Sequence, residues 1–520
     1  MPAPTVALDK LHCIHLENGC FSDDTQTQAG DMDRLLDAFI DQSPAAGMVV
    51  HFHGGLVSLK SGGDIADRLS KEYKKAGAYP VFFVWESGAI ESVANNLRDI
   101  GKEPIFHELV RKVVEFALGR LGSAIGGKGG SGAAVDPVQV AQDVDKWFAD
   151  ASGNPPYADF KLQPQAAGDK AALVADLEFE NSVMADLEMD PRIKSVLEQV
   201  QQGLLPAGQT EDAPGGGQLA ARTTLMEPKA LDEILEARQP GEKGLISTAK
   251  LAWAIIKLVR AVVSRFLDGR DHGLYCTVVE EIYRQMYVDK IGQAFFWNQM
   301  KKDTADAFAP TGAPGKEPGG TEFLRRLGAR LKSGAANPRI TLVGHSTGAV
   351  YICHLLEAAD KYLPDDVRFD IVFLAPAVDF RLFQSAMEKY GHRVGNFRLF
   401  GMTDTLEKDD PMAQDFLGKK LASVVYPHSL LYFVSGLLEG REVDTPILGM
   451  QRFFDKTDTF NREAYPEVQW AREKFSEHSV WSISDTADGR RSTSRQHGGF
   501  DNDETTLVSL RHLIQLGYQP

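Results

Sequence analysis

Short apolar runs separated by helical patterns are the feature that most constrains the fold of this chain. The runs are rich in β-branched and aromatic residues, and most are continuous, which is typical of strands buried on both faces of a parallel sheet. They lie at residues 11–16, 48–52, 79–85, 340–343, 369–374, 396–400 and 480–483. Helical spacing predicts helices over 64–76, 322–331, 349–362 and 505–516. The alternation predicts an α/β fold with a doubly wound, mainly parallel sheet.

The alternation of strand and helix stops between residues 85 and 340. Residues 98–320 have apolar patterning of helical period, which is too strong for a linker, and glycine-rich segments interrupt it at 122–132 and 205–217. We therefore expect a large helical insertion at 98–320, a candidate cap or lid, between the strand at 79–85 and the strand at 340–343. The two parts of one sheet domain, 1–97 and 321–520, would flank it. A chain of 520 residues is long enough for such an enlarged domain.

Charge and cysteine content exclude several classes of function. Asp and Glu number 72 against 56 Lys and Arg, which gives a net charge of −16, and no basic block is present, so we expect no nucleic-acid partner. Four cysteines without a C-x-x-C pair predict neither a disulfide framework nor a zinc site. Together with the lack of a secretory signal pattern, this leads us to expect a cytoplasmic protein that uses no metal and no cofactor.

The longest apolar segment bears on contact with membranes. Residues 251–267 are interrupted by Lys257, Arg260 and Arg265, so we expect no integral membrane segment. As a helix, residues 245–267 would have one apolar face. Two interpretations stay open: a helix that packs on a core, and an interfacial helix that makes peripheral membrane contact or forms a lid over substrate.

Residues 340–350 carry the strongest chemical signal. A β-rich run leads into Gly344-His345-Ser346-Thr347-Gly348, a Gly-x-Ser-x-Gly pattern, and a run with helical spacing follows. In a nucleophile elbow the serine sits on a strained turn between strand and helix, and the two glycines let neighbouring backbones pack where a Cβ would clash. The helix that follows directs its positive end toward the serine. The pattern therefore predicts Ser346 as a nucleophile.

A second element supports this interpretation. The run at 48–52 leads into His53-Gly54-Gly55-Leu56. With the elbow, this segment resembles the α/β-hydrolase superfamily, of the serine esterase or lipase type, in which the loop after the third strand supplies backbone N–H groups to an oxyanion hole. The resemblance implies oxyanion donors at Gly55, Leu56 and Thr347.

The resemblance also implies a base and an acid, in the chain order serine, acid, histidine. His497 is the best-placed base, because it lies in a loop between the last strand run and the closing helix; His428 is the alternative. Asp404 lies just beyond the run at 396–400 and is the preferred acid. The alternative acids are Asp379, Glu407, Asp409 and Asp410.

These residues together predict a serine hydrolase that cleaves carboxylic esters through an acyl-enzyme on Ser346. Its partner would be a small-molecule ester or a lipid substrate. An acyltransferase, thioesterase or amidase would use the same nucleophile. A protein of hydrolase fold that binds a partner, with weak or no catalysis, is the alternative from a different class.

Overall fold

The computed structural model describes most of the chain. The described residues are 7–87, 90–125, 136–160, 177–203, 225–234, 248–288, 293–312, 316–332, 337–439, 443–455 and 463–518. The glycine-rich segment predicted at 205–217 lies outside these ranges, as does the segment at 122–132 from residue 126 onward.

Seven strands form one sheet in which all neighbours are parallel, in the order β1-β3-β2-β4-β5-β6-β7. They are β1 (Cys13–Leu16), β2 (Met48–Phe52), β3 (Tyr79–Trp85), β4 (Ile340–His345), β5 (Phe369–Leu374), β6 (Val394–Met402) and β7 (Ser479–Ser482). Each predicted run forms a strand. Strands β1 to β5 are buried along their whole length, which explains why their sequences are apolar without alternation.

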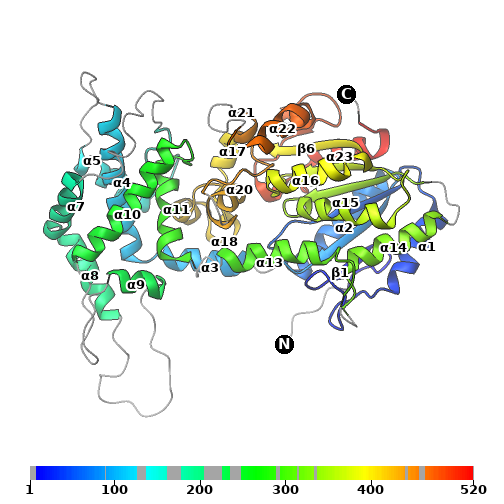
Figure 1. The fold of residues 1–520 in the computed structure, drawn as a ribbon, viewed down its shortest axis with the longest axis horizontal. Coiled ribbons are helices and arrows are strands. Elements are labelled where there is room, and N and C mark those ends of the chain that lie inside the picture. The colour runs from blue at the N-terminus through cyan, green and yellow to red at the C-terminus, as the bar shows by residue number, and fades with distance from the viewer. Residues whose placement is uncertain are drawn as a thin grey trace, which may run out of the picture.

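Helices cover both faces of the sheet (Figure 1). One face carries α1 (Asp31–Gln42), α14 (Gly319–Lys332), α15 (Gly348–Tyr362), α16 (Phe380–Tyr390) and α22 (Pro466–Phe475). The other face carries α2 (Leu59–Lys75) and α23 (Glu504–Leu516). Within β2, Val50 and Phe52 belong to the first core and Val49 to the second, as the twofold period of a strand requires. The expected α/β architecture with a parallel sheet is therefore present.

The described part of the chain between β3 and β4 is mainly helical. Besides α14, its helices are α3 (Ile90–Ile100), α4 (Pro104–Ile125), α5 (Pro137–Ala149), α7 (Leu177–Met189), α8 (Pro191–Gly203), α9 (Pro228–Ile234), α10 (Thr248–Leu267), α11 (Leu274–Met286) and α13 (Gln293–Asp306). Most of them gather beside the sheet, at the left of Figure 1, while α3 and α13 lead to and from that group. Helix α13 packs on α15 of the sheet layer.

Helix α10 is the core of this helical group. Its apolar residues, among them Leu251, Ile255, Leu258 and Val262, are buried, and it packs against α4, α7, α9 and α11. Trp253 is 43% exposed on the opposite side. Its neighbours cover the apolar face, so the described part of the 245–267 segment packs on a core.

A different segment has the length and apolar composition of a membrane span. Among the described residues it is the stretch Lys419–Leu438, and 89% of it is buried inside the protein. It comprises α19 (Lys419–Val425), α20 (Leu430–Phe433) and a π-helical turn, η3 (Val434–Leu438), which pack against α3, α11 and α13. Burial among these helices accounts for its apolar composition.

Candidate active site

Ser346 occupies the sharp turn between β4 and α15. Its φ is +52°, in the left-handed region that non-glycine residues seldom adopt. A Cβ on Gly344 would lie 2.7 Å from the carbonyl oxygen of Gly348, and a Cβ on Gly348 would overlap the carbonyl oxygen of Phe52. Both positions therefore require glycine, which is the physical basis of the Gly-x-Ser-x-Gly spacing.

Backbone hydrogen bonds to the neighbouring strand support this strained turn. The N–H of Ser346 donates to the carbonyl of Leu374 at the end of β5 (2.8 Å), and its carbonyl accepts from the N–H of Ala377 (3.0 Å). The turn is thus attached to the segment that follows β5. Such support is what allows an unfavourable φ to persist in a folded chain.

The structure brings His497 to Ser346. His497 begins a short 3-10 turn, η5 (His497–Gly499), and its Nε2 lies 2.9 Å from Oγ of Ser346. Burial, and next the nearby His345, lower the pKa of His497 to about 3. The imidazole is therefore neutral at pH 7, so the serine hydroxyl donates and Nε2 accepts. A neutral imidazole in this position can take the serine proton.

Two groups hold the backbone of His497 in place. Its N–H donates to Oδ2 of Asp410 (2.7 Å), and its carbonyl accepts from Nε2 of His345 (3.0 Å). Because Nε2 accepts from the serine, Nδ1 must carry the proton of the neutral ring. That buried Nδ1–H has no hydrogen-bond partner in the described part of the chain.

Among the candidate acids, Asp410 is the one that forms a hydrogen bond with His497. Burial raises its pKa to about 6, against the hydrogen bonds from His497 and Gln414, which lower it. The Gln414 amide donates to Oδ1 across 2.5 Å, which leaves Oδ2 to the backbone of His497. Asp410 was one of the open alternatives for the acid.

Asp404, the preferred acid from sequence, has other partners. It begins α17 (Asp404–Lys408), and its carboxylate accepts from the Tyr432 hydroxyl (2.5 Å) and from Nζ of Lys408 (2.7 Å). Although burial opposes it, the charges of Lys408 and Arg452 hold the pKa of Asp404 below its usual range. No hydrogen bond joins Asp404 to His497 among the residues described.

The remaining candidates from the sequence also lie in other surroundings. Asp379 caps α16 by accepting from the N–H of Leu382 (2.9 Å). Glu407 is buried and accepts from the Ser429 hydroxyl, and burial raises its pKa well above the usual range. Asp409 pairs with Lys419 at the surface. The alternative base, His428, donates from Nε2 to the carbonyl of His272 (2.8 Å) instead of facing Ser346.

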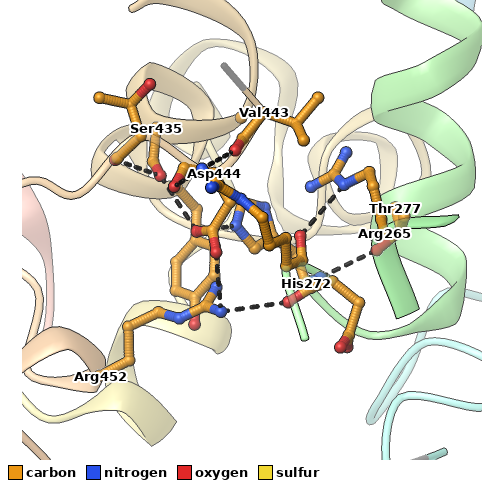
Figure 2. A network of polar contacts seen from close by, with 12 residues as sticks. Arg265, His272, Thr277, Ser435, Val443, Asp444 and Arg452 are labelled. Carbon is orange, nitrogen blue, oxygen red and sulfur yellow. Dashed lines mark hydrogen bonds and ion pairs between the residues drawn. The ribbon is translucent and has the colours of Figure 1, made fainter. Parts of the chain in front are cut away.

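Arg452, whose charge acts on Asp404, belongs to a buried polar network (Figure 2). The two ring nitrogens of His272 contact Glu280 (2.7 Å) and Asp444 (2.8 Å), Arg265 pairs with Glu280 (2.6 Å), and Arg452 pairs with Asp444 (3.2 Å). The network joins α10 and α11 to the segment around residue 444. Sequence patterns did not reveal it, because its members are up to 187 positions apart.

Strand register places the His-Gly-Gly loop beside the elbow. Strands β2 and β4 are neighbours, with Phe52 opposite Gly344, so the residues that follow each strand lie side by side. A Cβ on Gly54 would lie 3.2 Å from Cβ of Ser346, and one on Gly55 would lie 2.8 Å from Oγ1 of Thr347. The three residues expected to form an oxyanion hole are therefore brought to Ser346.

The loop also leaves N–H groups available. Leu56 has a φ of +60°, and the imidazole of His53 anchors the loop by donating to the carbonyl of Gly54 (2.8 Å) and accepting from the N–H of Trp85 (3.2 Å). Within the described ranges, no hydrogen bond occupies the N–H of Leu56 or of Thr347. Thr347 precedes α15, so its N–H is also one of the free donors at the positive end of a helix.

Ser346 and His497 open onto a cavity of about 520 Å³. Much of its lining is polar and comes from α2, the 410–416 segment and the loop around His497. The polar lining includes Ser61, Asp64, Arg68, Gln414, Asp415 and Asn502. Across the part of the chain that is described, no group of three or more His, Cys, Asp or Glu residues is arranged to hold a metal ion.

The arrangement can support acyl transfer. It combines a serine hydroxyl, a neutral imidazole within hydrogen-bond distance and unoccupied N–H donors beside the serine. No protein-family model, curated protein or solved structure matches this chain. Its chemistry is therefore inferred from its own residues.

Proposed function

We propose that this chain is a serine hydrolase of the α/β-hydrolase type, which cleaves carboxylic esters through an acyl-enzyme on Ser346. One observation carries the proposal: Nε2 of His497 lies 2.9 Å from Oγ of a serine held at a φ of +52°. A strained serine paired with a buried, neutral imidazole is the arrangement of an activated nucleophile. The adjacent loop with free N–H groups supports the same conclusion.

The reaction would proceed in two halves. In the first, Oγ of Ser346 attacks the ester carbonyl carbon while Nε2 of His497 takes its proton. The N–H groups of Leu56 and Thr347 hold the oxyanion, and His497 then gives the proton to the departing alcohol oxygen. In the second, His497 takes a proton from water, which attacks the acyl-enzyme. His497 then gives this proton to Oγ of Ser346 as the bond from the acyl carbon to Oγ breaks and the acid leaves.

We assign the role of the acid that supports the histidine base to Asp410. Its carboxylate contacts the backbone of His497 and lines the same cavity, whereas Asp404 is engaged with Lys408 and Tyr432. Nδ1–H of His497 lacks a partner and is the group that an adjacent carboxylate would stabilise once the ring becomes charged. With a pKa of about 6, Asp410 is mostly ionised at pH 7 and above.

Active-site labelling tests the proposal directly. A fluorophosphonate probe should modify Ser346 of the wild-type protein, with the site identified by mass spectrometry. Ser346→Ala should abolish labelling and turnover of p-nitrophenyl acetate, and His497→Gln should slow both by about 10²–10⁴-fold. Ser476→Ala, which removes a surface hydroxyl, serves as the matched control. Labelling of Ser346→Ala at the wild-type rate would reject the proposed nucleophile.

The same experiment addresses the class of bond that is cleaved. Thioesters, amides and acyl transfer to an alcohol acceptor would use the same serine, so p-nitrophenyl esters are compared with a matched anilide and a matched thioester. Preference for the oxygen ester is expected. A wild-type protein without labelling or turnover would instead favour a binding role for this fold.

A further inference from the structure

A second, apolar pocket adjoins the open cavity and shares Gly55, Leu56, Met412 and Leu430 with it. Gly55, Leu56 and Thr347, the residues of the proposed oxyanion hole, are part of its lining. Its volume is about 20 Å³. Because one water-sized sphere occupies roughly 10–15 Å³ on this scale, the pocket has room for one group of about the size of a methyl.

The lining residues of the two cavities indicate which cavity takes the alcohol part of an ester and which takes the acyl part. His497 must protonate the leaving alcohol, and it lines the open cavity but not the apolar pocket. The alcohol part therefore belongs in the open cavity. The acyl substituent leaves the carbonyl carbon in another direction, and the apolar pocket lined by the oxyanion residues is the space that we assign to it.

Side chains of α13 form a fixed wall of this pocket. Met300 is 3% exposed, and its Sδ would lie only 2.7 Å from a Cβ placed on Gly55. Trp297, one turn earlier, donates its indole N–H to Glu439 (2.9 Å), and Lys301 pairs with the same carboxylate (2.7 Å). These contacts attach α13 to the end of the 419–438 segment, so the wall cannot withdraw without breaking partly buried polar contacts.

On the basis of the proposed function, we propose that this pocket receives the acyl group and limits it to acetyl. Met300 and Trp297 are then the specificity-determining residues. In the reaction the bond between Oγ of Ser346 and the acetyl carbon forms as the bond from that carbon to the alcohol oxygen breaks. The serine proton passes through His497 to the alcohol, and water then releases acetate and restores the serine hydroxyl.

The test compares kcat/KM for p-nitrophenyl acetate, butyrate and octanoate. The wild-type protein should prefer acetate to octanoate by at least about 100-fold, because each methylene that does not fit costs about tenfold or more. Met300→Ala removes much of the wall and should raise the ratio of butyrate to acetate by at least about tenfold. Leu438→Ala, which enlarges the opposite wall, should shift the ratio in the same direction. Met189→Ala, at a side chain 80% exposed on α7, should leave it unchanged.

Two results would overturn the acetyl proposal while sparing the proposed function. The first is equal turnover of octanoate and acetate by the wild-type protein. The second is an unchanged ratio in both enlarged variants while Ser346 still reacts with the fluorophosphonate. Failure of the proposed function has a different signature, since the wild-type protein would then show no labelling at Ser346 and no turnover of any ester.

Discussion

The backbone N–H of His497 donates to Oδ2 of Asp410 across 2.7 Å, while Nδ1 of the same imidazole has no partner in the described part of the chain. The carboxylate thus holds the loop that carries the imidazole. This relationship distinguishes Asp410 from the other acids that follow β6.

Asp410→Asn should therefore lower kcat/KM for p-nitrophenyl acetate by about 10²–10⁴-fold, because it removes the charge opposite the developing imidazolium. Asparagine keeps an acceptor for the backbone N–H of His497, so the loop should stay in place. Asp404→Asn is the comparison, and per folded molecule it should retain activity within several-fold. A larger loss in Asp404→Asn than in Asp410→Asn would return the role to Asp404.

The pH dependence of kcat/KM should reflect the ionisation of Asp410. Both His497 and Asp410 must be deprotonated in the reactive form, and burial puts their pKa values at about 3 and about 6. The higher of the two pKa values sets the pH at which the reactive form appears, so kcat/KM should rise with pH through about 6 and then reach a plateau. In Asp410→Asn this acid limb should disappear from the range pH 5–8. A limb that persists near pH 6 in the variant would assign it to another group.

Asp410 should also make the free energy of unfolding depend on pH. The pKa of Asp410 in the folded protein, about 6, lies above its ordinary value of 3.8, so its contribution to stability is complete below pH 3.8 and is lost as pH rises through 6. Between pH 5 and pH 8, the free energy of unfolding of the wild-type protein should fall by about 1 kcal/mol relative to that of Asp410→Asn. Urea denaturation of both proteins at the two pH values measures this difference, and a pH-independent difference would contradict it.

Gly348→Ala should destabilise the protein strongly. The new Cβ would overlap the carbonyl oxygen of Phe52, a backbone atom in β2 that cannot move without displacing the His-Gly-Gly loop. We expect a loss of about 3 kcal/mol or more, together with loss of fluorophosphonate labelling. Gly391→Ala is the control, because nothing lies within 4 Å of its Cβ and its φ of −61° suits alanine. Thermal unfolding should separate the two variants by many degrees.

The buried network of Figure 2 gives a prediction about stability alone. His272→Ala removes the imidazole between Glu280 and Asp444 and leaves both buried carboxylates short of a hydrogen-bond partner. His272→Ala should lower the free energy of unfolding by about 3–5 kcal/mol. Lys257→Ala, which removes the exposed ion pair with Glu233, should lower it by less than about 1 kcal/mol. Equal shifts in the urea midpoint would show that the network does not hold the helical group to the sheet.

Local signals in the sequence were sufficient for the strands of the main sheet. All seven of its strands lie at the predicted apolar runs, and β1 to β5 are continuous runs because strands buried on both faces cannot carry alternating polar residues. The elbow at Ser346 was likewise visible, because its two glycines are imposed by backbone atoms that are close in the local turn and in β2. His497 was identified by its place between the last strand and the closing helix.

Only the tertiary structure decided relationships that depend on how distant segments meet. Strand order placed β2 next to β4 and so brought Gly55 and Leu56 to the serine. The path of the chain after β6 turned Asp404 toward Tyr432 and Asp410 toward His497, although both lie in the same short segment. The return of α13 to the sheet placed Met300 at the oxyanion loop. Periodicity and spacing describe contacts between near neighbours, whereas these contacts arise from packing between segments far apart in the chain.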